Sequence, residues 1–357
     1  MRKGWEYKKL GEVCDIYQPK TISTDMLSKD GEYPVYGANG VIGYYHQYNH
    51  EDKEVLLTCR GATCGNINVS KPYSWINGNA MVIHRKSEFI DFDFLKYMML
   101  SLDYSLIITG AAQPQITRQK LAPIKIAIPP KSTQLAIVSE LDKINELIRL
   151  KKEQLKDFDN LAQSLFYEMF GDPVENEKGW EVKKLIEVSS LINGRAYKQN
   201  ELLSEGKYKV LRVGNFFTNS NFYYSNLELE DEKYCYKGDL LFAWSASFGA
   251  FIWDEDKTIF HYHIWRVLFD KAILDIHYYQ YLLNTMTSFF MNDVHGIGMV
   301  HLTKSGMEQY ELPLPPLSLQ RLFAQRIEQI EREKSEVQKT IQDLETLLAS
   351  RMQYWFE

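Results

Sequence analysis

Hydrogen-bonding side chains gather in three glycine-containing stretches near the start of this sequence. The stretches are YGANGVIGYY (36–45), TCRGATCGN (58–66) and GAAQPQITRQK (110–120). Arginine, asparagine, glutamine and small hydroxyls bind base edges, and aromatic rings stack on bases or contact thymine methyl groups. These residue types therefore suit the recognition of nucleic acid, while the glycines serve the turns. The candidate binding residues of these stretches are Asn39, Tyr44, Arg60, Thr63, Asn66, Gln113, Gln115 and Arg118.

A second set of the same residue types lies beyond residue 200. The candidates are Arg212, Asn215, Asn219, Trp244, Ser247, His261, His263, His295, His301 and Lys304. Two kinds of residue in this set also have a structural interpretation. Trp244 is as well suited to a core as to a surface, and the histidines of HYH (261–263) can be satisfied inside a core.

Catalytic and metal-binding patterns are weak by comparison. Cys59 and Cys64 resemble half of a metal site, but no second Cys or His pair stands at zinc spacing. The run 51–53 (EDK) imitates the end of a nuclease metal motif, yet three residues match often by chance. The sequence has no GxxxxGK[ST] loop for ATP and no Asn-Pro-Pro-aromatic sequence of the kind that adenine methyltransferases use on a flipped base. We therefore expect neither catalysis, nor a metal, nor a cofactor in this chain.

An internal repeat supplies the elements that must position these loops. Three pairs of segments match in order along the chain, and their offset grows from 175 to 186 residues, as loops of different length would cause. The pairs are GWEYKKLGEV (4–13) with GWEVKKLIEV (179–188), LLTCRGATCG (56–65) with LLFAWSASFG (240–249), and IPPKSTQLAIVSELDKI (128–144) with LPPLSLQRLFAQRIEQI (314–330). The chain is therefore two copies of one unit.

Each copy begins with a long stretch rich in aromatic residues, glycine and asparagine. Short apolar runs at 54–58, 80–84 and 124–128 are typical of strands bounded by turns. One helical pattern interrupts them at 92–106, and its counterpart lies near 276–291. This mixture predicts a compact α+β domain in each copy.

After the Pro-Pro pairs 129–130 and 315–316 the pattern changes to a heptad repeat. Apolar residues recur at spacings of four and three, which is typical of a coiled coil. The apolar positions are Ile137, Leu141, Ile144, Ile148, Leu155, Phe158 and Leu165 in the first helix, and Phe323, Ile327, Ile330, Val337, Ile341, Leu344 and Leu348 in the second. We expect Ser132 and Ser318 to cap these helices and Gly171 to end the first one.

A long amphipathic helix cannot bury its apolar seam alone, so we expect the two helices to pack on each other. An antiparallel pair gives both copies equivalent surroundings and relates them by a pseudo-two-fold axis, and we favour it over a parallel pair. The predicted fold is therefore α+β, with two similar domains joined by two long helices in an antiparallel coiled coil. The expected boundaries are 1–130 and 171–316 for the domains, and 131–170 and 317–357 for the helices.

Composition narrows the class of protein further. No apolar run of the 357 residues approaches the ~18 residues needed to span a membrane, no secretory signal is visible, and the four cysteines are sparse. These features predict a cytoplasmic protein. The net charge is −6, and segment 171–316 alone has 14 basic and 20 acidic residues. Because affinity for DNA needs lysine and arginine, this charge predicts weak, salt-sensitive binding by the chain alone.

The ordered set of motifs resembles the specificity subunit of type I restriction–modification systems. The aromatic-led starts at 4–13 and 179–188, the Pro-Pro junctions, the heptads and the tandem arrangement all match, over essentially the whole chain. The resemblance implies that 1–130 and 171–316 are target-recognition domains, each reading one half of an asymmetric bipartite sequence in double-stranded DNA. It also implies that the helices set the spacer between the two halves.

The resemblance implies partners as well. The chain would have no catalysis of its own and would join two modification subunits, which carry S-adenosylmethionine and methylate adenine, and ATP-driven restriction subunits, with no membrane involved. The acidic second domain suggests that its basic residues cluster on one face and that these partners supply much of the phosphate contact, and we favour both acting together. The family junction usually shows an acidic residue before its glutamine, and Thr133 and Leu319 stand there instead, before Gln134 and Gln320. This difference concerns local capping.

Two other functions fit parts of the pattern. The main alternative is a coiled-coil spacer scaffold with two protein-binding heads. A second is a recognition subunit for a self-contained methylating nuclease. Neither alternative explains why the chain has two heads of equal size and different sequence.

Overall fold

The computed structural model describes the chain except residues 1, 3, 111, 219 and 293–301. It divides into two compact units, each with a globular head. Unit 1 is Met1–Lys152 with Lys339–Glu357, and unit 2 is Glu153–Gln338. The division passes through the middle of both long helices. The reason is that each head shares its apolar core with the helix segments beside it. Among the described residues, no helix has the length and apolar character that crossing a membrane requires.

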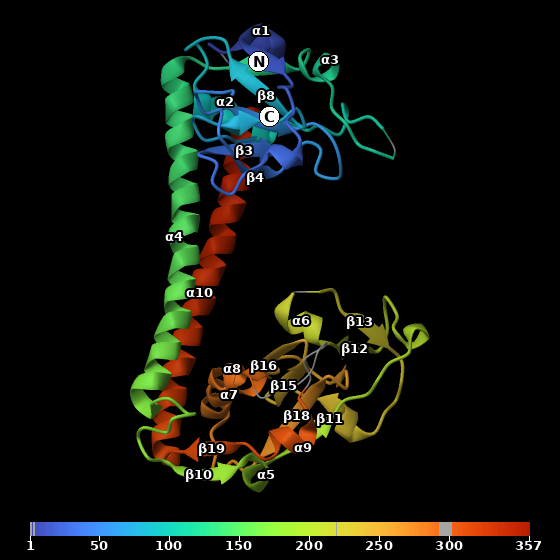
Figure 1. The fold of residues 1–357 in the computed structure, drawn as a ribbon, viewed down its shortest axis with the longest axis vertical. Coiled ribbons are helices and arrows are strands. Elements are labelled where there is room, and N and C mark those ends of the chain that lie inside the picture. Colours follow the sequence, from blue (N-terminus) through green and yellow to red (C-terminus); the bar gives the residue numbers. More distant parts are fainter. Residues whose placement is uncertain (1, 3, 111, 219, 293–301) are drawn as a thin grey trace. The chain divides into compact units, whose positions relative to one another are not determined.

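The head of unit 1 is built on small sheets (Figure 1). The four-stranded antiparallel sheet runs in the order β2 (Cys14–Tyr17), β8 (Ala80–Arg85), β5 (Val55–Thr58) and β6 (Ile67–Val69). A second sheet runs β4 (Gly40–Tyr45), β3 (Tyr33–Gly37) and β7 (Trp75–Ile76), and a two-stranded sheet joins β1 (Glu6–Lys9) to β9 (Lys125–Ile128). The helical segments are α1 (Leu10–Val13), η1 (Thr24–Met26), α2 (Phe92–Ser101) and α3 (Arg118–Leu121).

The head of unit 2 repeats this order of elements and, in its described residues, adds two α-helices, one 3-10 helix and one strand. Its first four-stranded sheet runs in the order β11 (Ser189–Asn193), β18 (Ile264–Phe269), β15 (Leu240–Ser245) and β16 (Ser247–Ile252). The second runs in the order β13 (Tyr223–Ser225), β12 (Tyr208–Leu211), β17 (Thr258–Phe260) and β14 (Tyr234–Cys235). A two-stranded sheet joins β10 (Glu181–Lys184) to β19 (Glu311–Leu314). Its helical segments are α5 (Leu185–Val188), η2 (Gln199–Glu201), α6 (Val213–Phe217), η3 (Asp231–Lys233), α7 (Ile276–Thr285), α8 (Thr287–Asn292) and α9 (Lys304–Met307). In both heads the second sheet contains one parallel pair, β3 with β7 and β12 with β17. The predicted α+β repeat is confirmed.

Two 40-residue helices, α4 (Lys131–Phe170) and α10 (Leu317–Phe356), contribute to both units. Their side chains pair across the helices within each unit. The ion pairs are Arg351 with Glu140 and Lys152 with Glu345 in unit 1, and Lys334 with Asp159 in unit 2. Residue numbers rise along α4 as they fall along α10, so the helices are antiparallel, as predicted (Figure 1). Gly171, with a φ of 78°, ends α4 as expected.

The apolar seam of these helices is largely buried. The buried positions are Ile137, Leu141, Ile144, Ile148, Phe323, Ile327, Ile330, Val337 and Ile341, and the half-buried ones are Leu155, Phe158, Leu165, Leu344 and Leu348. Towards the end of α4, Ala162, Phe166 and Phe170 are the fully buried residues. The buried face widens there because α4 packs on the head as well as on α10: the ring of Phe166 contacts both Tyr278 and Phe323.

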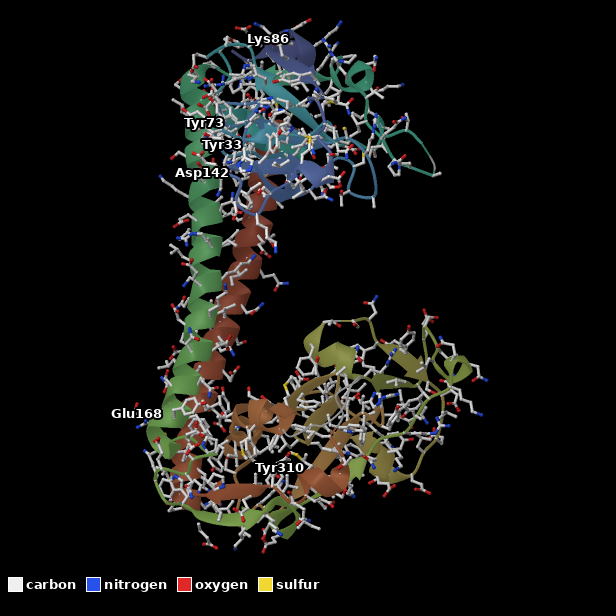
Figure 2. The ribbon with its side chains drawn as sticks, viewed as in Figure 1. Tyr33, Tyr73, Lys86, Asp142, Glu168 and Tyr310 are labelled. Carbon is white, nitrogen blue, oxygen red and sulfur yellow. The ribbon has the colours of Figure 1, made fainter. Side chains whose placement is uncertain are left out.

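The head of unit 1 also docks on α4 through polar contacts. Helix α2 places the Tyr97 hydroxyl 2.5 Å from Asp142, a residue of α4 labelled in Figure 2. Asn145 of α4 donates to the same hydroxyl over 3.0 Å. Burial and the Asp142 carboxylate raise the pKa of Tyr97, so this hydroxyl remains a donor. The contact fixes α2, and with it the sheets, against the long helix.

The serines at the two junctions do not cap the long helices as predicted. Helix α4 begins at Lys131 and α10 at Leu317, so Ser132 and Ser318 lie inside the first turn. The carbonyls of the preceding prolines, Pro130 and Pro316, accept the first backbone hydrogen bonds instead. Proline fits here because its carbonyl is available and its fixed φ suits the entry to a helix.

Candidate nucleic-acid interface

Two of the predicted loops of the first head pair with each other. Gln115, in the loop before α3, forms an antiparallel bridge with Arg60, in the loop after β5. The Gly61 amide donates to the Pro114 carbonyl over 2.9 Å. Backbone pairing of this kind holds both loops in place, so the Arg60 side chain projects from a fixed position.

The third loop joins them through side chains. Asn39 lies in the turn between β3 and β4, and its Oδ1 accepts a hydrogen bond from the Thr63 hydroxyl over 2.6 Å. The Thr58 hydroxyl donates to the neighbouring Ala38 carbonyl. The structure therefore brings together residues from all three stretches that the sequence analysis selected.

The electrostatics of this cluster favour an anionic ligand. Arg60 and Gln115 are exposed, as are Asn39, Asn66 and Gln113, while Thr63 is half-buried. The stretches 36–45, 58–66 and 110–120 contain no acidic residue. Arg118, which is also exposed, opens α3 three residues after Gln115.

Tyr44 is the one candidate of the first head that lies apart from the cluster. It is near the far end of β4, five residues from Asn39, or about 17 Å along an extended strand. The Ser28 amide donates to its backbone carbonyl over 2.9 Å, and its side chain is exposed. Tyr44 therefore belongs to the outer strand of the second sheet, where Ser28 bridges its backbone.

In the second head, the loop of His261 gathers the candidate residues. The His261 amide donates to the Leu211 carbonyl over 2.9 Å, which places it beside Arg212. The Trp244 amide donates to the His263 carbonyl over 3.1 Å, and the two rings meet edge to face at 5.2 Å. Four residues from three distant stretches therefore form one cluster.

His261 is electrically neutral in this cluster. Burial, helped by the charges of His263 and Arg212, lowers the pKa of His261 from 6.5 to about 4. The His263 amide lies 3.4 Å from His261 Nδ1 and donates to it. The proton of the neutral ring therefore resides on Nε2, which makes that atom a donor.

Sequence reasoning missed two members of this cluster. Arg195 pairs with His261 in a parallel bridge, and its guanidinium makes two bonds to Glu201, of 2.9 and 2.8 Å. Tyr262 donates its amide to the Arg195 carbonyl over 3.1 Å and is exposed. Tyr262 stands between two residues that were selected, so the HYH motif itself was the available signal. Arg195 had no comparable signal in the sequence, because its bridge to His261 joins residues that are far apart in the chain.

Other candidates of the second head use their polar groups locally. The Trp244 indole N–H donates to the Tyr262 carbonyl over 3.0 Å, and its ring stacks on Trp265. Asn215 accepts from the Arg212 amide and donates to the Ser220 carbonyl over 2.7 Å. Each of these side chains therefore shapes its loop.

Two of the remaining candidates lie at the starts of regular elements. Lys304 opens α9 and pairs with Glu308 at 3.7 Å, and Ser247 begins β16 beside the tight turn at Ala246. Asn219, His295 and His301 lie outside the described residues.

The thiols of the chain are poor ligands and nucleophiles. Cys14, Cys59 and Cys235 are buried and Cys64 is half-buried. Burial raises the pKa of Cys14 to about 12, so this side chain remains a protonated thiol. Within the part of the chain that the structure describes, no three His, Cys, Asp or Glu side chains are grouped to hold a metal ion.

Comparison with known proteins identifies the family. The model of the type I restriction modification DNA specificity domain matches residues 2–157 and, a second time, residues 177–346. This chain belongs to that family. The two matched stretches of the specificity-domain family coincide with the two copies of the internal repeat.

Curated relatives carry the same family name. A putative type I restriction enzyme specificity subunit of Haemophilus influenzae is 25% identical over 344 residues, which cover 91% of this chain and 87% of the relative. The MjaVIII specificity subunit of Methanocaldococcus jannaschii is 21% identical over 395 residues, covering 96% and 92%.

Solved structures share the fold. The type I S subunit from M. genitalium matches with a TM-score of 0.58 at 13% identity, covering 99% of this chain and 96% of that one. A chain from a structure of type I restriction–modification complex assembly and conformational transition matches with a TM-score of 0.63 at 19% identity, covering 99% and 97%. At these identities the likeness concerns the fold alone.

Proposed function

We propose that this chain is a specificity subunit that reads an asymmetric bipartite sequence in double-stranded DNA and directs modification and restriction subunits to it. One observation carries the proposal. The two heads share one order of elements, yet their equivalent loops present different side chains. Two copies of one fold suit two half-sites, and different side chains make the half-sites differ.

The two clusters are the proposed contact surfaces. In the first head, Arg60 and Gln115 meet Asn39 and Thr63 on loops without acidic residues. In the second head, Arg212 lies beside a neutral, donor-bearing His261. Arginine and the amides bind base edges or phosphates, so the chemistry of both clusters suits DNA.

The proposal assigns recognition, and no catalytic step, to this chain. The methyl donor S-adenosylmethionine and the ATP that drives restriction would bind to partner subunits. The absence of a GxxxxGK[ST] loop and of an Asn-Pro-Pro-aromatic sequence supports this division of labour. Each unit offers the same order of elements to a partner, which suits two copies of a modification subunit.

The test is co-expression with a candidate modification subunit, followed by methylation-sensitive sequencing of the host DNA. The expected result is one asymmetric bipartite motif, methylated on adenine only when this chain is present. A complex without a methylated motif would instead indicate a scaffold with protein-binding heads. Failure to form any complex would contradict the proposal.

A domain exchange separates the two half-sites. Replacing residues 171–316 with the equivalent stretch of a relative of different specificity should change one half of the motif and leave the other half intact. The matched control exchanges 1–130 and should change the opposite half. A change in both halves from either exchange would contradict the assignment of one half-site to each head.

A further inference from the structure

Within the described part of unit 1, the Arg60 guanidinium differs from most arginine side chains in making no hydrogen bond or ion pair. The side chains of the others, apart from Arg118, hydrogen-bond within the unit: Arg2 to Tyr354 and Trp355, Arg85 to Glu88, Arg149 to Glu146 and Arg351 to Glu140. Among the described residues no acceptor engages the Arg60 guanidinium. An exposed cation on a backbone held by bridges is poised for a ligand, because little ordering remains when it binds.

The amide side chains on the loops that pair with the Arg60 loop carry N–H donors. The Thr63 hydroxyl donates to Asn39 Oδ1, so the Asn39 amide offers its NH₂ group to a ligand. Gln115 bridges Arg60 through its backbone and keeps an exposed amide side chain. A ligand that fits must therefore present several acceptors close together.

We propose that the first head reads a guanine through Arg60, with Asn39 and Gln115 beside it. In the major groove guanine presents two acceptors, N7 and O6, on one edge, and a bidentate arginine matches them. A phosphate needs only positive charge, which Arg118 and Lys120 of the adjacent α3 supply. The neutral amides beside Arg60 favour a base edge over a phosphate. This inference rests on the proposed DNA-reading function.

The second head lacks this chemistry at the matching place. In the repeat, Trp244 stands where Arg60 stands. Its indole N–H is bonded to the Tyr262 carbonyl, and the ring stacks on Trp265. At this position of the repeat, therefore, the first head has the side chain for a guanine contact and the second head does not.

The first test reads the methylated motif of variants in the full complex. Arg60→Gln should relax one guanine position in a single half of the motif and leave the other half unchanged. Arg118→Gln is the matched control, since it removes an exposed charge nearby, and it should lower methylation at all sites without altering the motif. A uniform loss with Arg60→Gln would overturn the inference in favour of a phosphate contact, and an unchanged level and motif would exclude contact altogether.

The second test measures binding of the same complex to DNA with 7-deazaguanine at the assigned position, which lacks the N7 acceptor. Wild type should bind this DNA about 5-fold more weakly than unmodified DNA, because one of the two hydrogen bonds of the bidentate contact is lost. Arg60→Gln should bind both DNAs equally. If wild type shows no methylated motif at all, the DNA-reading function fails; if the motif is intact but 7-deazaguanine has no effect, only the Arg60 inference fails.

Discussion

At the scale of single residues, one buried glutamine in each half explains the motif at the domain–helix junction. Gln134 Nε2 donates to the carbonyls of Phe89 and Pro129, and its Oε1 accepts from the Asp91 amide over 2.7 Å. Asp91 in turn caps α2. Gln320 repeats each of these bonds with Ile273, Pro315 and Asp275. This glutamine ties the start of a long helix to the start of a head helix.

Replacing this glutamine should destabilise its unit. Gln134→Ala leaves two carbonyls and one amide without partners in a buried site, and we expect a loss of about 3 kcal/mol. Urea unfolding of the whole chain, with hydrogen exchange of the α2 amides as the readout for unit 1, measures this loss. Gln119→Ala, at an exposed position of α3, is the control and should change stability by less than about 0.5 kcal/mol. A Gln134→Ala unit as stable as the control would refute this role.

The lowered pKa of His261 predicts a pH effect on unit 2. The folded form binds the proton of His261 only near pH 4, whereas the unfolded form binds it near pH 6.5. Stability should therefore fall as pH drops from about 6.5 to 4, since the unfolded state then takes up the proton first. Histidine NMR titration should show a midpoint near 4 for the signal that disappears in His261→Gln. A midpoint near 6.5 would contradict the buried neutral ring.

At the scale of elements, the long helices are shared between the cores of both heads. The start of α4 and the end of α10 enter the core of the first head through Ile137, Leu141 and Trp355. The end of α4 and the start of α10 enter the core of the second head through Phe166 and Phe323. The heptad pattern predicted the helix-to-helix seam, and the additional contacts with the heads account for the wider buried face.

The ion pair between Glu140 and Arg351 should report the register of the helices in unit 1. Arg351 makes two bonds to Glu140, and Trp355 Nε1 adds a third over 2.9 Å. Glu140→Ala and Arg351→Ala should each cost about 1 kcal/mol, and the double variant should cost less than their sum. Asp343→Ala, exposed on the same helix, is the control. Additive losses would show that the two side chains do not interact in solution.

The pair of Glu140 and Arg351 also predicts that the stability of unit 1 falls at acid pH, here because a carboxylate loses its charge. The hydrogen bond from Arg351 lowers the pKa of Glu140 below its ordinary 4.5. The contribution of the pair is therefore present above pH 4.5 and is lost as pH falls through the lowered value. The Glu140→Gln variant should lose less stability than wild type over this acid range. Parallel acid curves for the two proteins would contradict the assignment.

At the scale of the whole molecule, the net charge limits the affinity that the chain alone can have for DNA. The net charge is −6, and the excess of acidic over basic residues lies mainly in segment 171–316, whereas the loops of the first cluster contain no acidic residue. The net charge therefore gives little long-range attraction to DNA, and under the proposed function local basic positions such as Arg60 and Arg212 act together with the charges of partner subunits.

The negative net charge predicts that the isolated chain binds DNA weakly. Fluorescence anisotropy with duplex DNA that contains the motif should give a dissociation constant above about 1 μM at 150 mM salt, and weaker binding as salt rises. The complex with modification subunits should bind far more tightly to the same DNA. Nanomolar binding by the chain alone would show that its own surface supplies the phosphate contacts.

The sequence by itself determined the repeat and the two long helices, and it singled out the loops that are rich in residue types suited to DNA. These are local or periodic properties, because a heptad or a repeated segment is written in consecutive residues. Only the tertiary structure decided which loops meet, as with Arg60 and Gln115, or Arg212 and His261. It also decided that Trp244 and Asn215 use their polar groups internally, and that Gln134 is buried. Such contacts join residues far apart in the chain through sheet register and packing, which no local pattern encodes.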